Sequence, residues 1–128
     1  AIFSKLKNLF NSRIFIIIAG LLAIIRWILM VYADSILFIS IIQILHAFTF
    51  GLTHIATIFF ISEIMPSRAQ AKCQALYSAI SMGAFLAIAI AISGDLYKYM
   101  YDKAFFFSAF LALTGVIIAT WFINIKKN

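Results

Sequence analysis

Five side chains of this sequence could bind a ligand or exchange a proton, and they are Arg26, Gln43, His46, Thr53 and His54. An arginine holds an anion through a planar fork of donors, and a histidine changes charge near neutral pH. Glutamine and threonine both donate and accept hydrogen bonds. All but Arg26 lie in QILHAFTFGLTH, residues 43–54, within a stretch from 35 to 62 that has no formally charged residue. Polar groups in so apolar a stretch predict a site, whose form depends on the elements that carry them.

These elements are predicted to be helices that cross a membrane. Of the 128 residues 66% are hydrophobic and 11% are charged, and the mean hydropathy is +1.12. Four apolar segments, about 14–32, 35–62, 73–94 and 104–125, each exceed the roughly 18 residues that a helix needs to span a bilayer core. Lipid offers backbone amides no partner and the segments lack strand-like alternation, so helices are expected. The sequence predicts a single all-α membrane domain over residues 1–128, with four transmembrane helices.

The distribution of charge predicts the sidedness of these helices. The basic residues around the segment ends include Lys5, Lys7, Arg13, Arg68, Lys72, Lys126 and Lys127. They precede the first segment, follow the second and follow the fourth, and cytoplasmic loops are the ones enriched in Lys and Arg. Both termini, the loop 1–13 and the middle connection are therefore expected on the cytoplasmic side. The net charge of +6 forms no stripe with interleaved aromatic residues, so no nucleic-acid partner is expected.

Local signals predict where three of the helices begin. Asp34 or Ser35 is a suitable N-cap for the second helix, and Asp102 for the fourth. Ser67 followed three residues later by Gln70 is typical of a capping box, which would start the third helix.

Polar residues of the second segment share one face. At 100° per residue, an arc of about 100° holds Gln43, His46, Phe50, Thr53, His54 and Thr57. Facing lipid this arc would be costly, so we expect it to face protein or a water-filled cavity. Arg26, on the preceding antiparallel helix, is expected level with Gln43 and about one turn above His46. We therefore hypothesise that Arg26, Gln43 and His46 form one hydrogen-bonded cluster.

Each of these residues also has a purely structural interpretation. Arg26 could extend toward the interface and only anchor its helix. His46 and His54 could be neutral side chains bonded to a neighbouring helix. Gln43 and the threonines are of types that often hydrogen bond between helices. These interpretations stay open at the level of the sequence.

Small residues recur every four positions in the third segment. They are Ala75, Ala79, Gly83, Ala87 and Ala91. Such a row lets another helix backbone approach closely, so we expect tight helix packing here, in part with segments outside this chain.

Catalytic and metal-binding chemistry is not supported by the residues present. Two histidines on one face of one helix lack a carboxylate or thiolate that would complete a zinc site, and Cys73 is a single cysteine without metal spacing. No glycine-rich phosphate loop occurs. We expect no enzyme activity, no cofactor and no metal.

Three segments of the sequence resemble a known transporter family. The Arg26-Trp27 pair, QILHAFTFGLTHIA at 43–56 and KCQALYSA at 72–79 resemble the last third of major facilitator superfamily transporters. The most similar branch is the phenylpropionate permease group, which is related to the oligosaccharide:proton symporters. The resemblance implies that the chain is a C-terminal part of a larger carrier and holds the last four helices of a twelve-helix fold. Its partners would be the lipid bilayer, the remaining helices, a small-molecule substrate and protons.

The resemblance also implies a function and a pathway. Such a multi-pass carrier of the inner membrane would move a small organic solute, of aromatic acid, sugar or nucleoside type, by alternating access and with proton linkage. The pathway residues would be Arg26, Gln43, His46, Thr49, Thr53 and His54.

The proton-coupling pattern of this family is matched only in part. Lactose permease-like members carry an arginine on the ninth helix, and a histidine and a glutamate on the tenth. Arg26 and His46 match the first two, but the glutamate position is Thr49 here. Threonine does not exchange a proton near neutral pH, so coupling would need His46 or an acid elsewhere in the transporter. The alternative function is a stand-alone four-helix membrane protein that acts as an oligomer, either a small exporter or a structural subunit.

Overall fold

The computed structural model describes residues 11–125, and in that range the chain is helical apart from short connections. The elements are α2 (Ser12–Val31), α3 (Ile36–Ile64), α4 (Ser67–Tyr77), the π-helix η1 (Ser78–Phe85), α5 (Leu86–Met100), the 3₁₀ turn η2 (Tyr101–Ala104) and α6 (Phe105–Ile125). The all-α class predicted from the sequence is therefore confirmed. Most of the predicted cytoplasmic loop 1–13 lies outside the described residues, which begin at Asn11.

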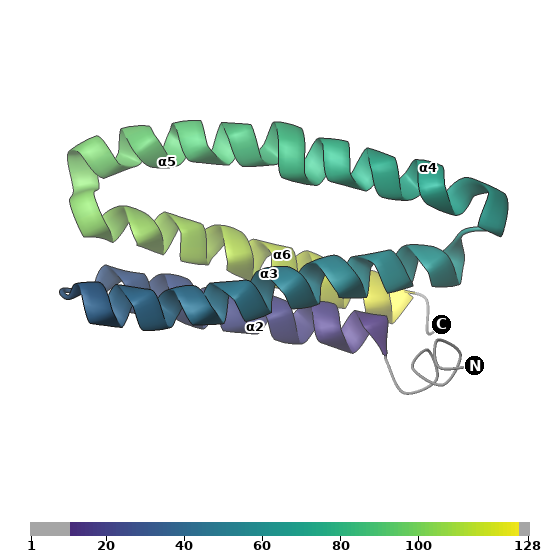
Figure 1. Ribbon diagram of the computed structural model, residues 1–128, viewed down its shortest axis with the longest axis horizontal. Helices are drawn as coiled ribbons and strands as arrows, with labels where there is room; N and C mark the ends of the chain where they lie inside the picture. The colour runs from purple at the N-terminus through teal and green to yellow at the C-terminus, as the bar shows by residue number, and fades with distance from the viewer. Residues whose placement is uncertain (1–10, 126–128) are drawn as a thin grey trace.

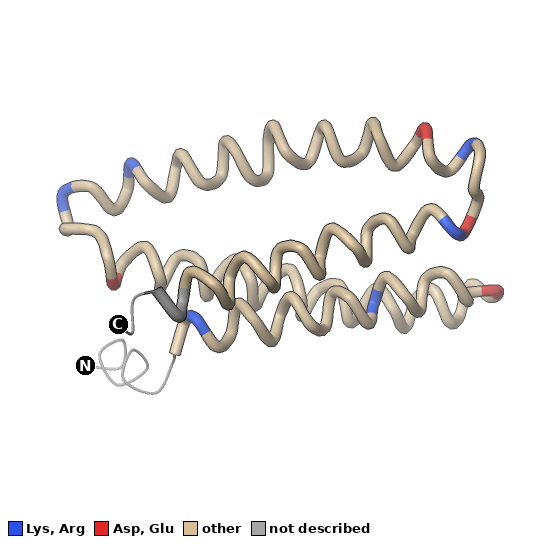
Figure 2. Tube along the Cα trace, turned by 180° about the vertical axis from the view of Figure 1, so that it is seen from behind, with Lys and Arg blue, Asp and Glu red and all other residues tan. Residues whose placement is uncertain are grey.

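The helices lie side by side and alternate in direction (Figure 1). α2 and α3 form one hairpin; α4, η1 and α5 form a continuous helical segment that returns along α3, and the chain reverses at η2 into α6. Three segments of the described chain are long and apolar enough to cross a membrane: Ser12–Val31, Ile36–Ile64 and the run Ser67–Phe122, which contains the reversal. Figure 2 shows that the charged residues gather at the two ends of the helices, apart from one basic position within α2.

α2 is the centre of the packing, because it contacts both α3 and α6 along its length. Small residues let these helices approach closely: Ala19 and Ala56 are completely buried, and a Cβ added at Gly20 would clash with Val116 of α6. On α3 the buried positions Ile42, Thr49 and Ala56 are spaced seven residues apart, which is the spacing of a helix–helix seam.

Polar contacts fasten α2 to α3 at the end where α2 begins. The buried Ser12 hydroxyl donates a hydrogen bond of 2.9 Å to Oε2 of Glu63. Next to it, the guanidinium of Arg13 lies 5.8 Å from the ring centre of Phe60. Glu63, which follows the uncharged stretch directly, thus acts between helices.

The predicted helix starts are confirmed for one helix and corrected for two. Ser35 caps α3 by accepting a hydrogen bond of 3.2 Å from the Phe38 amide. The Ser67–Gln70 capping box is wrong: Pro66 precedes α4 without a side-chain cap, and Gln70 Nε2 instead donates to the carbonyls of Ser62 (3.1 Å) and Met65 (3.0 Å). The Gln70 side chain is therefore bonded to carbonyls at the C-terminal end of α3, which have no partner within that helix.

Asp102 is also not the N-cap predicted for the last helix. It lies inside η2, where its backbone carbonyl accepts from the Phe105 amide. Because the 3₁₀ turn leads directly from α5 into α6, no extended residue is left to act as a cap there.

The third predicted segment is longer in the structure than in the sequence analysis. Helical structure extends over 67–100 where an apolar segment at 73–94 was expected. The difference arises because hydropathy marks only the part that suits a membrane core, whereas a helix can continue through polar residues on either side. The π-helical turns at Ser78–Phe85 leave no mark in the hydrophobic pattern.

No helix covers the row of small residues within the described part of the chain. The row Ala75, Ala79, Gly83, Ala87 and Ala91 is exposed. A Cβ added at Gly83 would meet no atom within 4 Å. The close helix contact at this row therefore stays a prediction, and its partner would be a segment other than those between residues 11 and 125.

Replacing Gly20 with alanine is predicted to loosen the α2–α6 contact. The added methyl group would meet Val116, and such overpacking costs about 1–3 kcal/mol. Gly51→Ala is the matched control, because no atom lies within 4 Å of a Cβ at that position. Thermal unfolding of the detergent-solubilised protein should show a lower midpoint for Gly20→Ala than for Gly51→Ala. Val116→Ala should restore the midpoint of Gly20→Ala, and no restoration would contradict the packing described.

Candidate functional site

An open cavity of about 250 Å³ lies between α2, α3 and the segment formed by α4, η1 and α5. Its lining residues are Ala23, Arg26, His46, Thr49, Phe50, Thr53, His54, Tyr77, Ser81, Met82 and Leu86. All the pathway residues expected from the sequence line it except Gln43. The face of α3 that was expected to point at protein or water thus borders a cavity.

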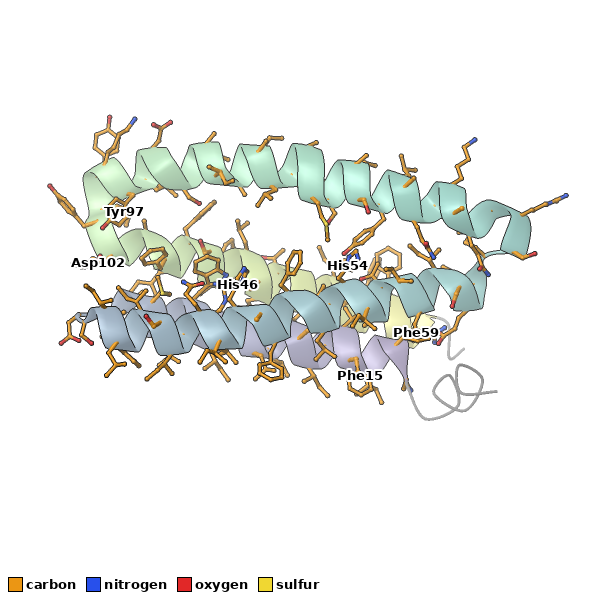
Figure 3. The ribbon with its side chains drawn as sticks, in the orientation of Figure 1. Phe15, His46, His54, Phe59, Tyr97 and Asp102 are labelled. Atoms are coloured by element: carbon orange, nitrogen blue, oxygen red, sulfur yellow. The ribbon has the colours of Figure 1, made fainter. Side chains whose placement is uncertain are left out.

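The arrangement follows from the helical repeat of α3. Thr49 and Ala56 are buried in the seam. Beside that seam, Phe50 follows His46 by four residues, and Thr53 and His54 follow Phe50 by three and four residues. Figure 3 shows His46 and His54 on the side of α3 that faces α4 and α5. One strip of α3, which holds Thr49 and Ala56, therefore packs against α2, and the adjacent strip, which holds His46, Phe50, Thr53 and His54, lines the cavity.

Arg26 is the charged group of this cavity. It is only 7% exposed, and its guanidinium carbon lies 3.8 Å from the ring centre of Trp27. Its Nε atom is buried without a hydrogen-bond partner, and the ion pair found in residues 11–125 joins Lys98 to Asp95 instead. A guanidinium that lies in an apolar span and pairs with no acid among the described residues attracts an anionic group.

Aromatic rings form one wall of the cavity. Going along α3, the ring centres of His46 and Phe50 are 6.0 Å apart and those of Phe50 and His54 are 6.3 Å apart. His54 in turn stacks on Tyr77 of α4, at 6.0 Å and an interplanar angle of 28°. Phe50 and His54 are almost parallel, at 3°. Such ring faces favour a flat, unsaturated ligand.

The threonine hydroxyls do not bond between helices as the sequence suggested. Thr49, Thr53 and Thr57 donate to the carbonyls of His46 (3.0 Å), Thr49 (2.7 Å) and Thr53 (2.8 Å), all on their own helix. Each hydroxyl donor is therefore satisfied within α3, because a threonine in a helix can bond to the backbone carbonyl one turn earlier. The hydroxyl oxygens of Thr49 and Thr53, two residues that line the cavity, can still accept hydrogen bonds.

The hydrogen-bonded cluster of Arg26, Gln43 and His46 is not formed. Between residues 11 and 125 no hydrogen bond links these side chains, and Gln43 is exposed beyond the end of the cavity. Helical side chains lean toward the N-terminus of their own helix, so in antiparallel helices Arg26 and Gln43 lean in opposite directions. Arg26 therefore shares the cavity with His46 and not with Gln43.

Sequence analysis missed the contribution of the third segment. Tyr77, Ser81, Met82 and Leu86 line the cavity, and Ser81 and Met82 belong to η1. The available signal was Tyr77 with Ser81 four residues later, two polar groups on one face of an apolar helix. π-Helical turns are often found at functional sites. Metal binding has no candidate here, since the described residues contain no cluster of three His, Cys, Asp or Glu side chains.

Comparison with known proteins gives two matches. The MFS_1 like family matches residues 2–109. The probable 3-phenylpropionic acid transporter of Escherichia coli (strain K12) is 30% identical over 118 residues, which is 92% of this chain and 31% of the relative. The chain thus spans about a third of the length of that relative. No solved structure matches the chain.

Cavity-lining positions are predicted to be accessible to water. In a Cys73→Ser background, Ser81→Cys and Thr53→Cys should react with a membrane-impermeant maleimide roughly tenfold faster than Ala79→Cys, because a thiol ionises and reacts readily only in contact with water. Ala79 is a matched control, since it is exposed on the same segment but does not line the cavity. Labelling of the complete protein in membranes measures the rates, and equal rates at all three positions would exclude a water-filled cavity.

Proposed function

The chain belongs to the MFS_1 like family of the major facilitator superfamily, and from this premise we propose that it forms part of a secondary carrier for an aromatic carboxylate. The family match supports a multi-pass membrane transporter in preference to an enzyme or a structural subunit. Similarity to a bacterial transporter supports placing the carrier in the inner membrane.

The observation that carries the substrate proposal is the position of Arg26 beside the stacked rings. Its charge has no acid partner among residues 11–125, so an incoming carboxylate would supply the countercharge. Phe50, His54 and Tyr77 offer ring faces on which an aromatic ring can stack. The relative is named as a probable transporter of 3-phenylpropionic acid, a molecule with one carboxylate and one ring. A sugar or a nucleoside would leave the guanidinium without a countercharge.

We propose four membrane spans: α2, α3, the segment 67–100 and α6. The ends that carry Arg13, Arg68 and Lys72 would be cytoplasmic, and the ends near Asp34 and Asp102 would face the other side. Support comes from the gathering of charged residues at the helix ends (Figure 2) and from the preference of basic residues for cytoplasmic loops. The cavity would then lie within the membrane, open toward segments that complete the pathway.

Transport by alternating access would need a second wall opposite this cavity. The chain corresponds to 31% of the length of its relative, so we assign that wall to the rest of the complete transporter. In such carriers two halves rock around a midplane site. Arg26 and His46 would then bind substrate from one side of the site.

Proton linkage would depend on His46. The position three residues later is Thr49, whose hydroxyl is bonded to the His46 carbonyl and which holds no exchangeable proton near neutral pH. His46 borders the same cavity as Arg26, so a proton on the imidazole and a carboxylate at the guanidinium would influence each other electrostatically. We propose that this coupling allows a pH gradient to drive uptake.

Removal of the Arg26 charge is predicted to abolish carboxylate selectivity. In cells expressing the full-length protein, Arg26→Gln should lower 3-phenylpropionate uptake by roughly 30-fold or more, since losing one partner of a buried charge pair costs about 2–5 kcal/mol. Arg26→Lys should keep part of the uptake, because it retains the charge without the planar fork. Arg13→Gln is the matched control at the end of the same helix. If 3-phenylpropionate and the neutral 3-phenylpropanol inhibited uptake equally, in the wild type as in Arg26→Gln, the substrate proposal would be refuted.

Replacement of His46 is predicted to uncouple transport from the pH gradient. His46→Gln should still equilibrate 3-phenylpropionate across proteoliposomes, but an imposed pH gradient should no longer drive accumulation, because glutamine does not titrate. Thr57→Val serves as the control, since Thr57 lies on the same helix and does not line the cavity. Accumulation by His46→Gln equal to that of wild type would place the coupling group elsewhere.

A further inference from the structure

Trp27 contacts the guanidinium of Arg26, which lines the cavity described above, and no role has so far been assigned to it. We propose that Trp27 is a positioning residue, whose ring face holds Arg26 in the orientation that receives the substrate carboxylate. The proposal rests on the function assigned to Arg26 above. It extends that function to a residue that does not itself line the Arg26 cavity.

The geometry of the pair is that of a desolvated cation–π contact. The guanidinium carbon lies 3.8 Å from the centre of the Trp27 ring, well within the roughly 6 Å over which such contacts act. Arg26 is buried, and its Nε makes no hydrogen bond to any residue in 11–125. Tryptophan is the best of the aromatic partners for a cation, and the attraction is stronger away from water. The indole is therefore the group that orients the guanidinium in the described chain.

The ring of Trp27 contacts a ring of α6, which in turn contacts a ring of α5. It stacks on Phe105 at the start of α6, with ring centres 5.8 Å apart and an interplanar angle of 17°. Phe105 in turn contacts Tyr97 of α5 at 6.2 Å. Trp27 also borders a second, largely apolar cavity of about 590 Å³ between α5 and α6. Arg26 is thus supported by Trp27, whose ring is in turn supported by rings from α6 and α5, and it also lines the first cavity.

An indole beside Arg26 leaves the charge of the guanidinium available, whereas a carboxylate would not. A carboxylate beside Arg26 would both orient the guanidinium and neutralise it, so the substrate would have to displace it. The indole orients the guanidinium through the ring quadrupole and carries no charge. Arg26 therefore keeps its full charge for the substrate while its side chain is held in place. Loss of Trp27 should weaken substrate binding more than turnover.

The test compares Trp27→Leu, Trp27→Phe and Trp121→Leu in the full-length protein. Trp121 is the matched control, because its ring contact in the described chain is with the neighbouring Phe122 only. For Trp27→Leu we expect a KM for 3-phenylpropionate raised about ten- to thirtyfold, as loss of a desolvated cation–π contact predicts, with maximal uptake per transporter within about twofold of wild type. Trp27→Phe should recover most of the affinity, and Trp121→Leu should leave KM unchanged.

A double variant separates positioning from simple packing. If Trp27 acts through Arg26, then adding Trp27→Leu to Arg26→Gln should not raise KM further. Additive effects of the two changes, or a fall in maximal uptake with unchanged KM, would overturn the proposal. Should Trp27→Leu not accumulate in membranes, Phe105→Leu tests the same stack, with Phe106→Leu beside it as the control, and an unchanged KM for Phe105→Leu would equally overturn it.

Failure of this inference is distinguishable from failure of the proposed function. If Arg26→Gln impairs carboxylate uptake but Trp27→Leu does not, the carrier function stands and the positioning role falls. If Arg26→Gln transports 3-phenylpropionate normally, the proposed function falls first and the positioning role falls with it.

Discussion

The constraint on which the structure depends is the burial of one guanidinium in an apolar helix. A charge in this position is expensive unless water, an acid or an aromatic face compensates it. In residues 11–125 the compensation is aromatic, through Trp27, because Arg26 has no acid partner there. Arg26 lines an open cavity between α2, α3 and the segment α4–η1–α5. The proposed anionic substrate follows from that one unneutralised charge.

Packing by small residues is what makes such a cavity possible. α2 lies against both α3 and α6, with Ala19 and Ala56 completely buried and Gly20 directly beneath Val116. At these positions the helices are in close contact. α4 approaches α3 mainly near their connection, and the polar strip of α3 therefore borders open space farther along. The side of α3 that packs closely against α2 is therefore structural, and the side that has few contacts with α4 is the one that lines the cavity.

Sequence patterns predicted the class of the fold and most of the cavity lining, but not the bonds within it. The 100° repeat placed His46, Thr53 and His54 on one face, and they do line one cavity. The expected bond between Arg26 and Gln43 failed, because side chains of antiparallel helices lean in opposite directions. The position of a residue along a helix axis can be predicted from its number. The neighbours that its side chain can contact depend on what packs beside it.

The sequence by itself determined that this chain is helical and suited to a membrane, since lipid requires every backbone amide to be bonded within its own segment. It also determined which residues of α3 share a face, because the helical repeat is local. Only the tertiary structure decided that Trp27 supports Arg26, that Tyr77 stacks on His54, and that Gln70 pairs with the end of α3. Apart from the adjacent Arg26 and Trp27, these contacts join different helices, and their partners are set by packing between segments that no local pattern encodes.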